Sequence, residues 1–149
     1  MICARQVHEI ERHWSDIADR TVQHLDAELT PYYAHKIPAA LVRERVEDLL
    51  GHLSNWLSSA DDERLAQKYE AVGRQRASEG IPLHEFVRVL QVIRRMALNY
   101  SLEHDTLDDR FAVYVESDLA LRIANFFDAA TFHAVRGYEL ALKGAKAAA

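Results

Sequence analysis

The chain has 149 residues, of which 49% are hydrophobic and 28% charged, and its formal net charge is −5. This length suits one domain with its own core, so we expect a single domain over residues 1–149. The acidic balance argues against nucleic-acid binding, which needs a positive surface to displace counterions. No apolar run approaches the ~20 residues that span a bilayer, so we expect a cytoplasmic protein without a membrane segment.

The first half of the chain predicts two helices, because apolar residues recur every three or four positions. The first helix is expected over about 7–29 and ends at Thr30-Pro31, since the residue before proline avoids the α region. The second begins at Pro38, a favoured first-turn residue, and continues to Leu57. Cys3 is the only cysteine, so an internal disulfide is excluded. It precedes both helices, and we expect it to lie in a frayed terminus without a role.

Two further helices follow in the same pattern. One is expected over 61–79, because it opens with an acidic first turn that suits the helix dipole. Gly80 fits the left-handed position that follows a helix end. The next helix opens after Pro82 and carries a broad apolar face up to Tyr100.

The last predicted helix is unusually long. Asp105 or Thr106 caps it, and its apolar positions continue to Leu142, which gives a length of ~50 Å at 1.5 Å per residue. A domain of this size is narrower than that, so either the helix breaks or its end projects towards a partner. The tail that follows, residues 144–149, is expected to fray. No strand is expected, and the predicted fold class is all-α.

No enzyme site is indicated by the spacing of the polar residues. The eight histidines form neither the Glu-x-x-His pairs of di-iron bundles nor the His-Glu-x-x-His of zinc proteases. A Gly-x-Ser-x-Gly elbow and a glycine-rich phosphate loop are also missing from the sequence. We therefore expect no enzymatic activity, no catalytic residue, no metal site and no cofactor.

One segment resembles a known family. Residues 72–83 read Val-Gly-Arg-Gln-Arg-Ala-Ser-Glu-Gly-Ile-Pro-Leu and lead into a helix that ends with Ile-Arg-Arg at 93–95. This pattern, together with Ile37-Pro38 and the helix after it, resembles the N-terminal domains of RsbR-type stressosome proteins, the RsbRD N-terminal family. The resemblance implies a globin-like sensory domain without haem, which dimerises and precedes a histidine-kinase or STAS output domain.

The same segment bears on haem binding. Haem-binding globin sensors carry their proximal histidine in a run similar to Ile-Gly-x-x-His-x-x-x-Gly-Ile-Pro, and here that histidine position is Arg76. A protonated guanidinium has no free lone pair for iron. Arg76 is instead expected either to contact an anion in the vacated pocket or to form an ion pair with a nearby acid. Tyr69 and Phe86 are further candidate ligand-binding residues.

The resemblance also leads us to expect a homodimer formed through the last helix. The candidate interface residues are Phe111, Val115, Tyr138 and Leu142. The leading hypothesis is thus a non-catalytic sensory domain for stress signalling, with a small ligand or another protein as its input. Two alternatives stay open: a haem sensor that uses a different histidine, such as His84 or His52, and an interaction module without a ligand.

Overall fold

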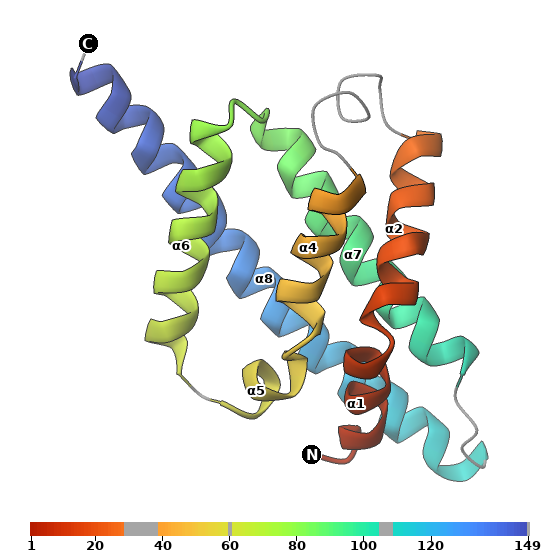
Figure 1. The fold of residues 1–149 in the computed structure, drawn as a ribbon. Coiled ribbons are helices and arrows are strands. Elements are labelled where there is room, and N and C mark those ends of the chain that lie inside the picture. Colours follow the sequence, from red (N-terminus) through yellow and green to blue (C-terminus); the bar gives the residue numbers. More distant parts are fainter. Residues whose placement is uncertain (29–38, 60, 105–108, 149) are drawn as a thin grey trace.

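The computed structural model describes residues 1–28, 39–59, 61–104 and 109–148, and every regular element in these ranges is a helix (Figure 1). In chain order the helices are α1 (Ala4–Arg12), α2 (Trp14–Glu28), α4 (Ala39–Leu50), α5 (Leu53–Ser58), α6 (Asp62–Ser78), α7 (Leu83–Glu103) and α8 (Asp109–Ala148). The predicted all-α, globin-like fold with a long C-terminal helix is confirmed. The ends predicted at Thr30-Pro31, Pro38 and Asp105 or Thr106 lie outside the described residues.

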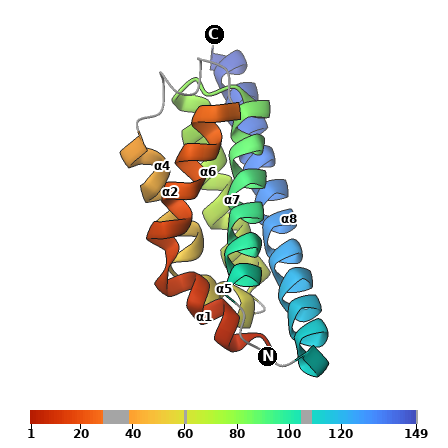
Figure 2. The ribbon, with the colours of Figure 1, turned by 90° about the vertical axis from the view of Figure 1, so that its right-hand side faces the viewer.

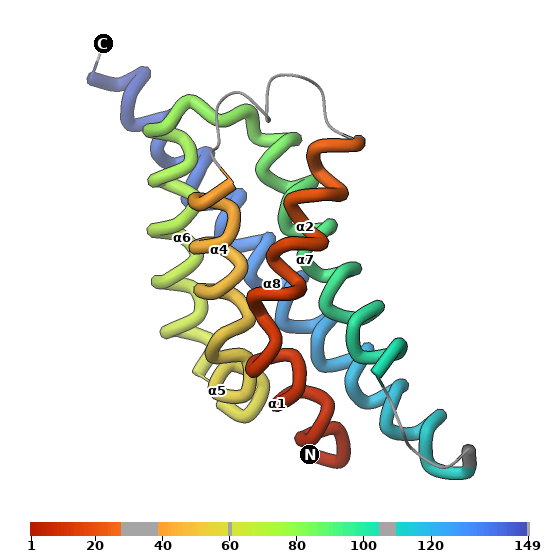
Figure 3. The backbone as a smooth tube through the Cα atoms, turned by 45° about the vertical axis from the view of Figure 1, so that its right-hand side comes forward, coloured from red at the N-terminus to blue at the C-terminus, as the bar shows by residue number. Residues whose placement is uncertain are grey.

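The helices form a bundle with α8 on one side. Figure 2 shows α8 opposite α2 and α4, with α6 and α7 between them. In Figure 3, α8 runs the length of the bundle, and its C-terminal end passes α6 and projects beyond it. The largest fully buried side chains come from six of the helices and form one core: Ile10, Ile17, Leu50, Leu53, Ile93, Leu119 and Ile123.

Two helices that were predicted to be continuous are each broken in two. The first breaks at His13, whose ring Nδ1 lies 2.9 Å from the carbonyl oxygen of Glu9 and donates to it. The second breaks at Gly51 and His52, where the backbone of His52 (φ −130°, ψ 30°) leaves the helical region. Both bends turn a short helix across the end of the bundle, and α1 and α5 pack against each other there.

The ends of the chain are more ordered than the sequence predicted. Cys3 is fully buried in the core, so the expectation of a frayed N-terminus is wrong. At the other end, α8 continues to Ala148 instead of ending near Leu142 and fraying. Alanine and lysine dominate its last residues, and both are strong helix formers.

The crossing of α6 and α8 depends on two glycines. A Cβ atom added to Gly73 would lie 1.8 Å from the carbonyl oxygen of Ala134, and one added to Gly137 would lie 2.1 Å from that of Glu70. Any side chain at either position would therefore collide with the backbone of the opposite helix. The missing side chains let the two helices touch backbone to backbone, which fixes the position of α8 beside α6.

The turn between α6 and α7 is built as its sequence predicts. Gly80 has a φ of 72°, the left-handed conformation that glycine adopts without strain. At the opposite end of α6, the carboxylate of Asp61 accepts a hydrogen bond from the backbone N–H of Arg64 at 3.0 Å. This cap and this turn fix both ends of α6, the helix that carries Tyr69 and Arg76.

Candidate functional site

A small apolar cavity lies between α4, α6 and α7, with a volume of about 50 Å³. Its apolar walls come from all three helices and include Val42, Leu49, Val72, Phe86 and Leu90. Five charged side chains also line it: Arg45, Asp48, Lys68, Arg76 and Glu79. An apolar cavity with a few convergent polar groups is the usual form of a small-molecule site.

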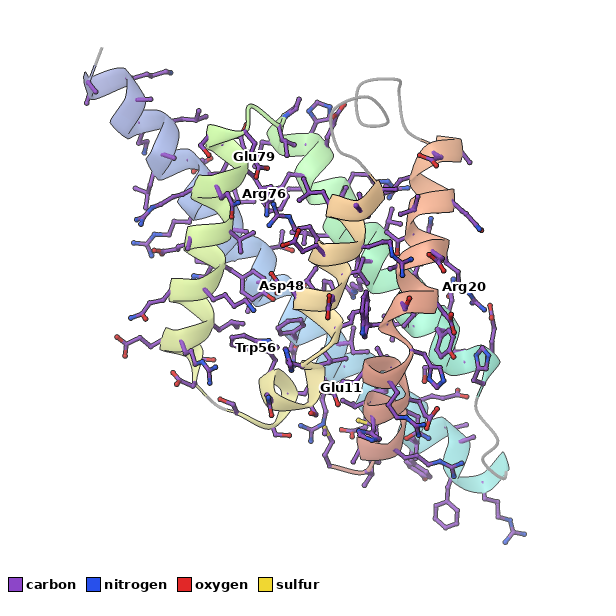
Figure 4. All side chains as sticks on the ribbon, viewed as in Figure 1. Glu11, Arg20, Asp48, Trp56, Arg76 and Glu79 are labelled. Carbon is purple, nitrogen blue, oxygen red and sulfur yellow. The ribbon has the colours of Figure 1, made fainter. Side chains whose placement is uncertain are left out.

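Arg76 is the most deeply buried of these charged groups, with only 3% of its surface exposed. It extends from α6 towards α4 (Figure 4). Its Nη1 donates to both carboxylate oxygens of Glu79, each at 2.7 Å, and Nη2 of Arg45 also reaches Oε1 of Glu79 at 3.3 Å. Glu79 therefore joins α4 to the end of α6 through two arginines.

Two polar atoms at this cavity lack a hydrogen-bond partner among the described residues. They are Nη2 of Arg76 and the hydroxyl of Tyr69, which is 2% exposed. Burial, and secondly the negative charge of Asp48, raise the pKa of Tyr69, so its hydroxyl stays protonated. A buried polar group without a partner costs roughly 1–3 kcal/mol, so both atoms gain from an occupant that hydrogen-bonds to them.

The cavity is connected directly to α8. The hydroxyl of Tyr138, on α8, donates a hydrogen bond to the carbonyl oxygen of Ile81, which lies in the turn between α6 and α7. Ile81 itself lines the cavity and is 4% exposed. One buried hydrogen bond and the glycine crossing therefore link the wall of the cavity to the C-terminal half of α8.

The three residues predicted to bind a ligand, Arg76, Tyr69 and Phe86, all line this one cavity. Both uses predicted for Arg76 are compatible with the structure, because Nη1 forms an ion pair while Nη2 has no partner within the described residues. The sequence reasoning missed Arg45 and Glu79. Glu79 lies three residues after Arg76, a spacing at which residues of a helix form ion pairs, so this contact could have been predicted. No residue near Arg45 in the sequence indicates that it contacts Glu79.

The four residues predicted for a dimer interface do not share one surface. Val115 and Tyr138 are 8% and 7% exposed, because they pack inside the chain's own core, and this part of the prediction needs correction. Phe111 and Leu142 are exposed, at 69% and 45%. The prediction treated the apolar positions of the last helix as one surface, although the helix has an inner and an outer side.

The chain matches a family model described as "RsbT co-antagonist protein rsbRD N-terminal domain" over residues 15–145. The chain belongs to this family. No significant match was found among curated proteins or among solved structures. The family confirms the resemblance seen in residues 72–95 and makes this RsbRD N-terminal domain a member of a stressosome signalling family.

The site of this RsbRD N-terminal domain does not fit a haem group. Arg76 occupies the position of a proximal histidine, and a cavity of about 50 Å³ is far smaller than a porphyrin. The two other candidate ligands, His52 and His84, are exposed, and neither lines the cavity. Within the described residues no cluster of His, Cys, Asp and Glu has the arrangement of a metal site, and no helix is long and apolar enough to cross a membrane.

Proposed function

We propose that this domain is a non-catalytic, homodimeric sensor, in which a small ligand in the Arg76 cavity alters α8, and α8 passes the change to an output domain. The output is a histidine-kinase or STAS-type domain, as the resemblance implies. The observation that supports this proposal is the hydrogen bond between Tyr138 and Ile81, because it connects the cavity wall to the helix that projects from the bundle. A ligand acts here only by its difference in affinity between two helix arrangements.

The sensing step is tested by perturbing the cavity and measuring amide hydrogen exchange in α8. Arg76→Met removes the buried guanidinium, and we expect exchange to change in residues 134–148. Arg74→Met is the matched control, because Arg74 is exposed on the same helix. Altered exchange confined to α4, α6 and α7 in R76M would contradict the proposal.

The dimer is proposed to form through the outer side of α8. Tyr114, Leu121 and Phe132 are 69%, 62% and 63% exposed, and their spacings of 7 and 11 residues place them on one side of a helix, opposite its buried residues. Large exposed apolar side chains in such a row are typical of an interaction surface. A second copy of the same helix offers the complementary row.

Sedimentation equilibrium tests this interface. We expect the wild-type chain to sediment as a dimer and Leu121→Glu to sediment as a monomer, because a carboxylate would be buried without a partner. Leu102→Glu serves as the control, since Leu102 is 53% exposed on α7 and lies outside the row. A monomeric wild type, or a dimer that survives L121E, would refute the interface.

The haem-sensor alternative is tested by an absorption spectrum before and after addition of hemin. We expect no Soret band to remain after gel filtration. A persistent band would show that a histidine binds iron despite Arg76, and the search would turn to His52 and His84. The ligand-free interaction module differs in another way, because filling the cavity would then leave α8 unchanged.

A further inference from the structure

Building on the proposed sensor, we infer that the Arg76 cavity binds a short-chain aliphatic monocarboxylic acid, whose carboxylate is held by Nη2 of Arg76. Four properties of the cavity support it: a buried donor without a partner, a net charge of one, apolar walls and a small volume.

The first of these properties is the open hydrogen-bond donor on Arg76. Nη2 of Arg76 has no hydrogen-bond partner among the described residues, although the side chain is 97% buried, while Nη1 is fully engaged by Glu79. A guanidinium is planar and always charged, and it matches the geometry of a carboxylate better than an ammonium does. An incoming carboxylate oxygen would satisfy Nη2 of Arg76, and the hydroxyl of Tyr69 is a second donor without a partner among the described residues at this cavity.

The charge of the site selects a monoanion. Three cationic side chains line the cavity, Arg45, Lys68 and Arg76, and two anionic ones, Asp48 and Glu79, which leaves a net charge of +1. One carboxylate neutralises this charge. A dianion such as phosphate would leave an excess negative charge beside the buried Arg76, and a cation would be repelled by Arg76.

The walls and the volume define the rest of the ligand. The remaining lining is aliphatic or aromatic, with Val42, Leu49, Val72, Phe86, Val89 and Leu90 as its main members. These side chains favour a hydrocarbon tail and offer it no hydrogen bonds. At roughly 10–15 Å³ per water-sized group, a cavity of about 50 Å³ holds about four such groups. The hydrocarbon tails of propionate, butyrate and isobutyrate have two or three carbon atoms and fit this limit when the carboxylate is held at Arg76, whereas the tails of fatty acids do not.

The proposal is tested by isothermal titration of the full chain at pH 7 with butyrate. Butyramide, which has a similar shape but no charge, and inorganic phosphate are titrated in parallel. We expect butyrate to saturate one site per chain and butyramide to bind at least about tenfold more weakly, since a charge-assisted hydrogen bond contributes roughly 1.5–3 kcal/mol. Phosphate binding as tight as that of butyrate would overturn the monocarboxylate assignment in favour of a general anion site.

Variants then locate the carboxylate. Arg76→Met should weaken butyrate binding at least about tenfold, whereas Arg74→Met should leave it unchanged. If R76M does not fold, Arg76→Lys keeps the charge but loses the planar fork, and we expect binding several-fold weaker than wild type. Butyrate binding that is equal in wild type and in the folded Arg76 variant would overturn the inference.

Failure of this inference can be told apart from failure of the sensor proposal. If no acid binds but R76M still changes hydrogen exchange in α8, then the cavity is coupled to α8 and the monocarboxylate assignment is wrong. If butyrate binds but α8 does not respond, the ligand class is right and the sensor proposal is wrong.

Discussion

The α6–α8 crossing gives the sharpest prediction on stability. Gly73 and Gly137 each face the backbone of the opposite helix, whereas Gly144 on α8 faces open space. Gly73→Ala would place a methyl group 1.8 Å from the carbonyl oxygen of Ala134, where real contacts stay above 3.0 Å. The helices would have to separate locally by at least the difference, 3.0 − 1.8 = 1.2 Å. The nearest atoms are backbone atoms of a long helix, so no side-chain rotation relieves the collision.

Overpacking of this kind costs roughly 1–3 kcal/mol or more, and the better helix propensity of alanine offsets up to about 1 kcal/mol of it. Because both collisions are with backbone atoms, we expect the upper end of this range, so that G73A lowers the free energy of unfolding by about 2–3 kcal/mol after the offset and G137A has a similar effect. Because both glycines serve one crossing, the double variant should cost less than the sum of the two. Once the helices have separated, the second methyl group meets less resistance.

Urea denaturation followed by circular dichroism measures these changes. Gly144→Ala is the control, because nothing lies within 4 Å of the added Cβ atom and the residue is within α8. That variant should be neutral or more stable by up to ~1 kcal/mol. Loss of less than about 0.5 kcal/mol in both G73A and G137A would refute the close crossing.

Three further predictions concern other parts of the fold. Burial raises the pKa of the Cys3 thiol from 9.0 to about 12, so at pH 8 its thiolate is about a thousandfold scarcer than that of an unshifted thiol. We expect the alkylation of Cys3 to be slower by the same factor until urea unfolds the chain. Because only the unfolded chain loses this proton between pH 9 and pH 12, the free energy of unfolding should fall as the pH rises through that range. Glu11 accepts hydrogen bonds from the backbone N–H and the hydroxyl of Ser54, at 2.7 and 2.6 Å, so Glu11→Ala should destabilise the chain by roughly 1–3 kcal/mol in urea, and Glu11→Gln by less. Gly80→Ala should lower the melting temperature through a backbone cost of about 1 kcal/mol, and Gly80→Asn should cost less; equal values for the two would contradict the left-handed turn.

The sequence was most informative where local chemistry decides the structure. Gly80 and the acidic start of α6 could be identified because a left-handed turn and a helix cap depend on neighbouring residues alone. The breaks at His13 and Gly51 could not, because the apolar spacing continues across both of them. Packing of the short helices α1 and α5 against each other decides these bends, and such packing involves residues far apart in the chain.

The candidate site was predicted in part for the same reason. Arg76 was found because a family motif marks its position, and the structure then shows that it is buried beside a cavity. Arg45 approaches Glu79 from another helix, and no pattern within one helix reveals that contact. Likewise Tyr138 reads as one apolar position among many, although its hydroxyl is bonded to a carbonyl group 57 residues earlier in the chain.

We propose above all that occupancy of the Arg76 cavity reaches α8 through Tyr138. Amide ¹H–¹⁵N spectra with saturating butyrate test it most directly, compared between the wild type and Tyr138→Phe, which loses only the hydroxyl that contacts Ile81. We predict shifts in α4, α6 and α7 in both proteins, and shifts in residues 137–148 of α8 in the wild type alone. Wild-type shifts that stop at the cavity and leave α8 unchanged would contradict the account.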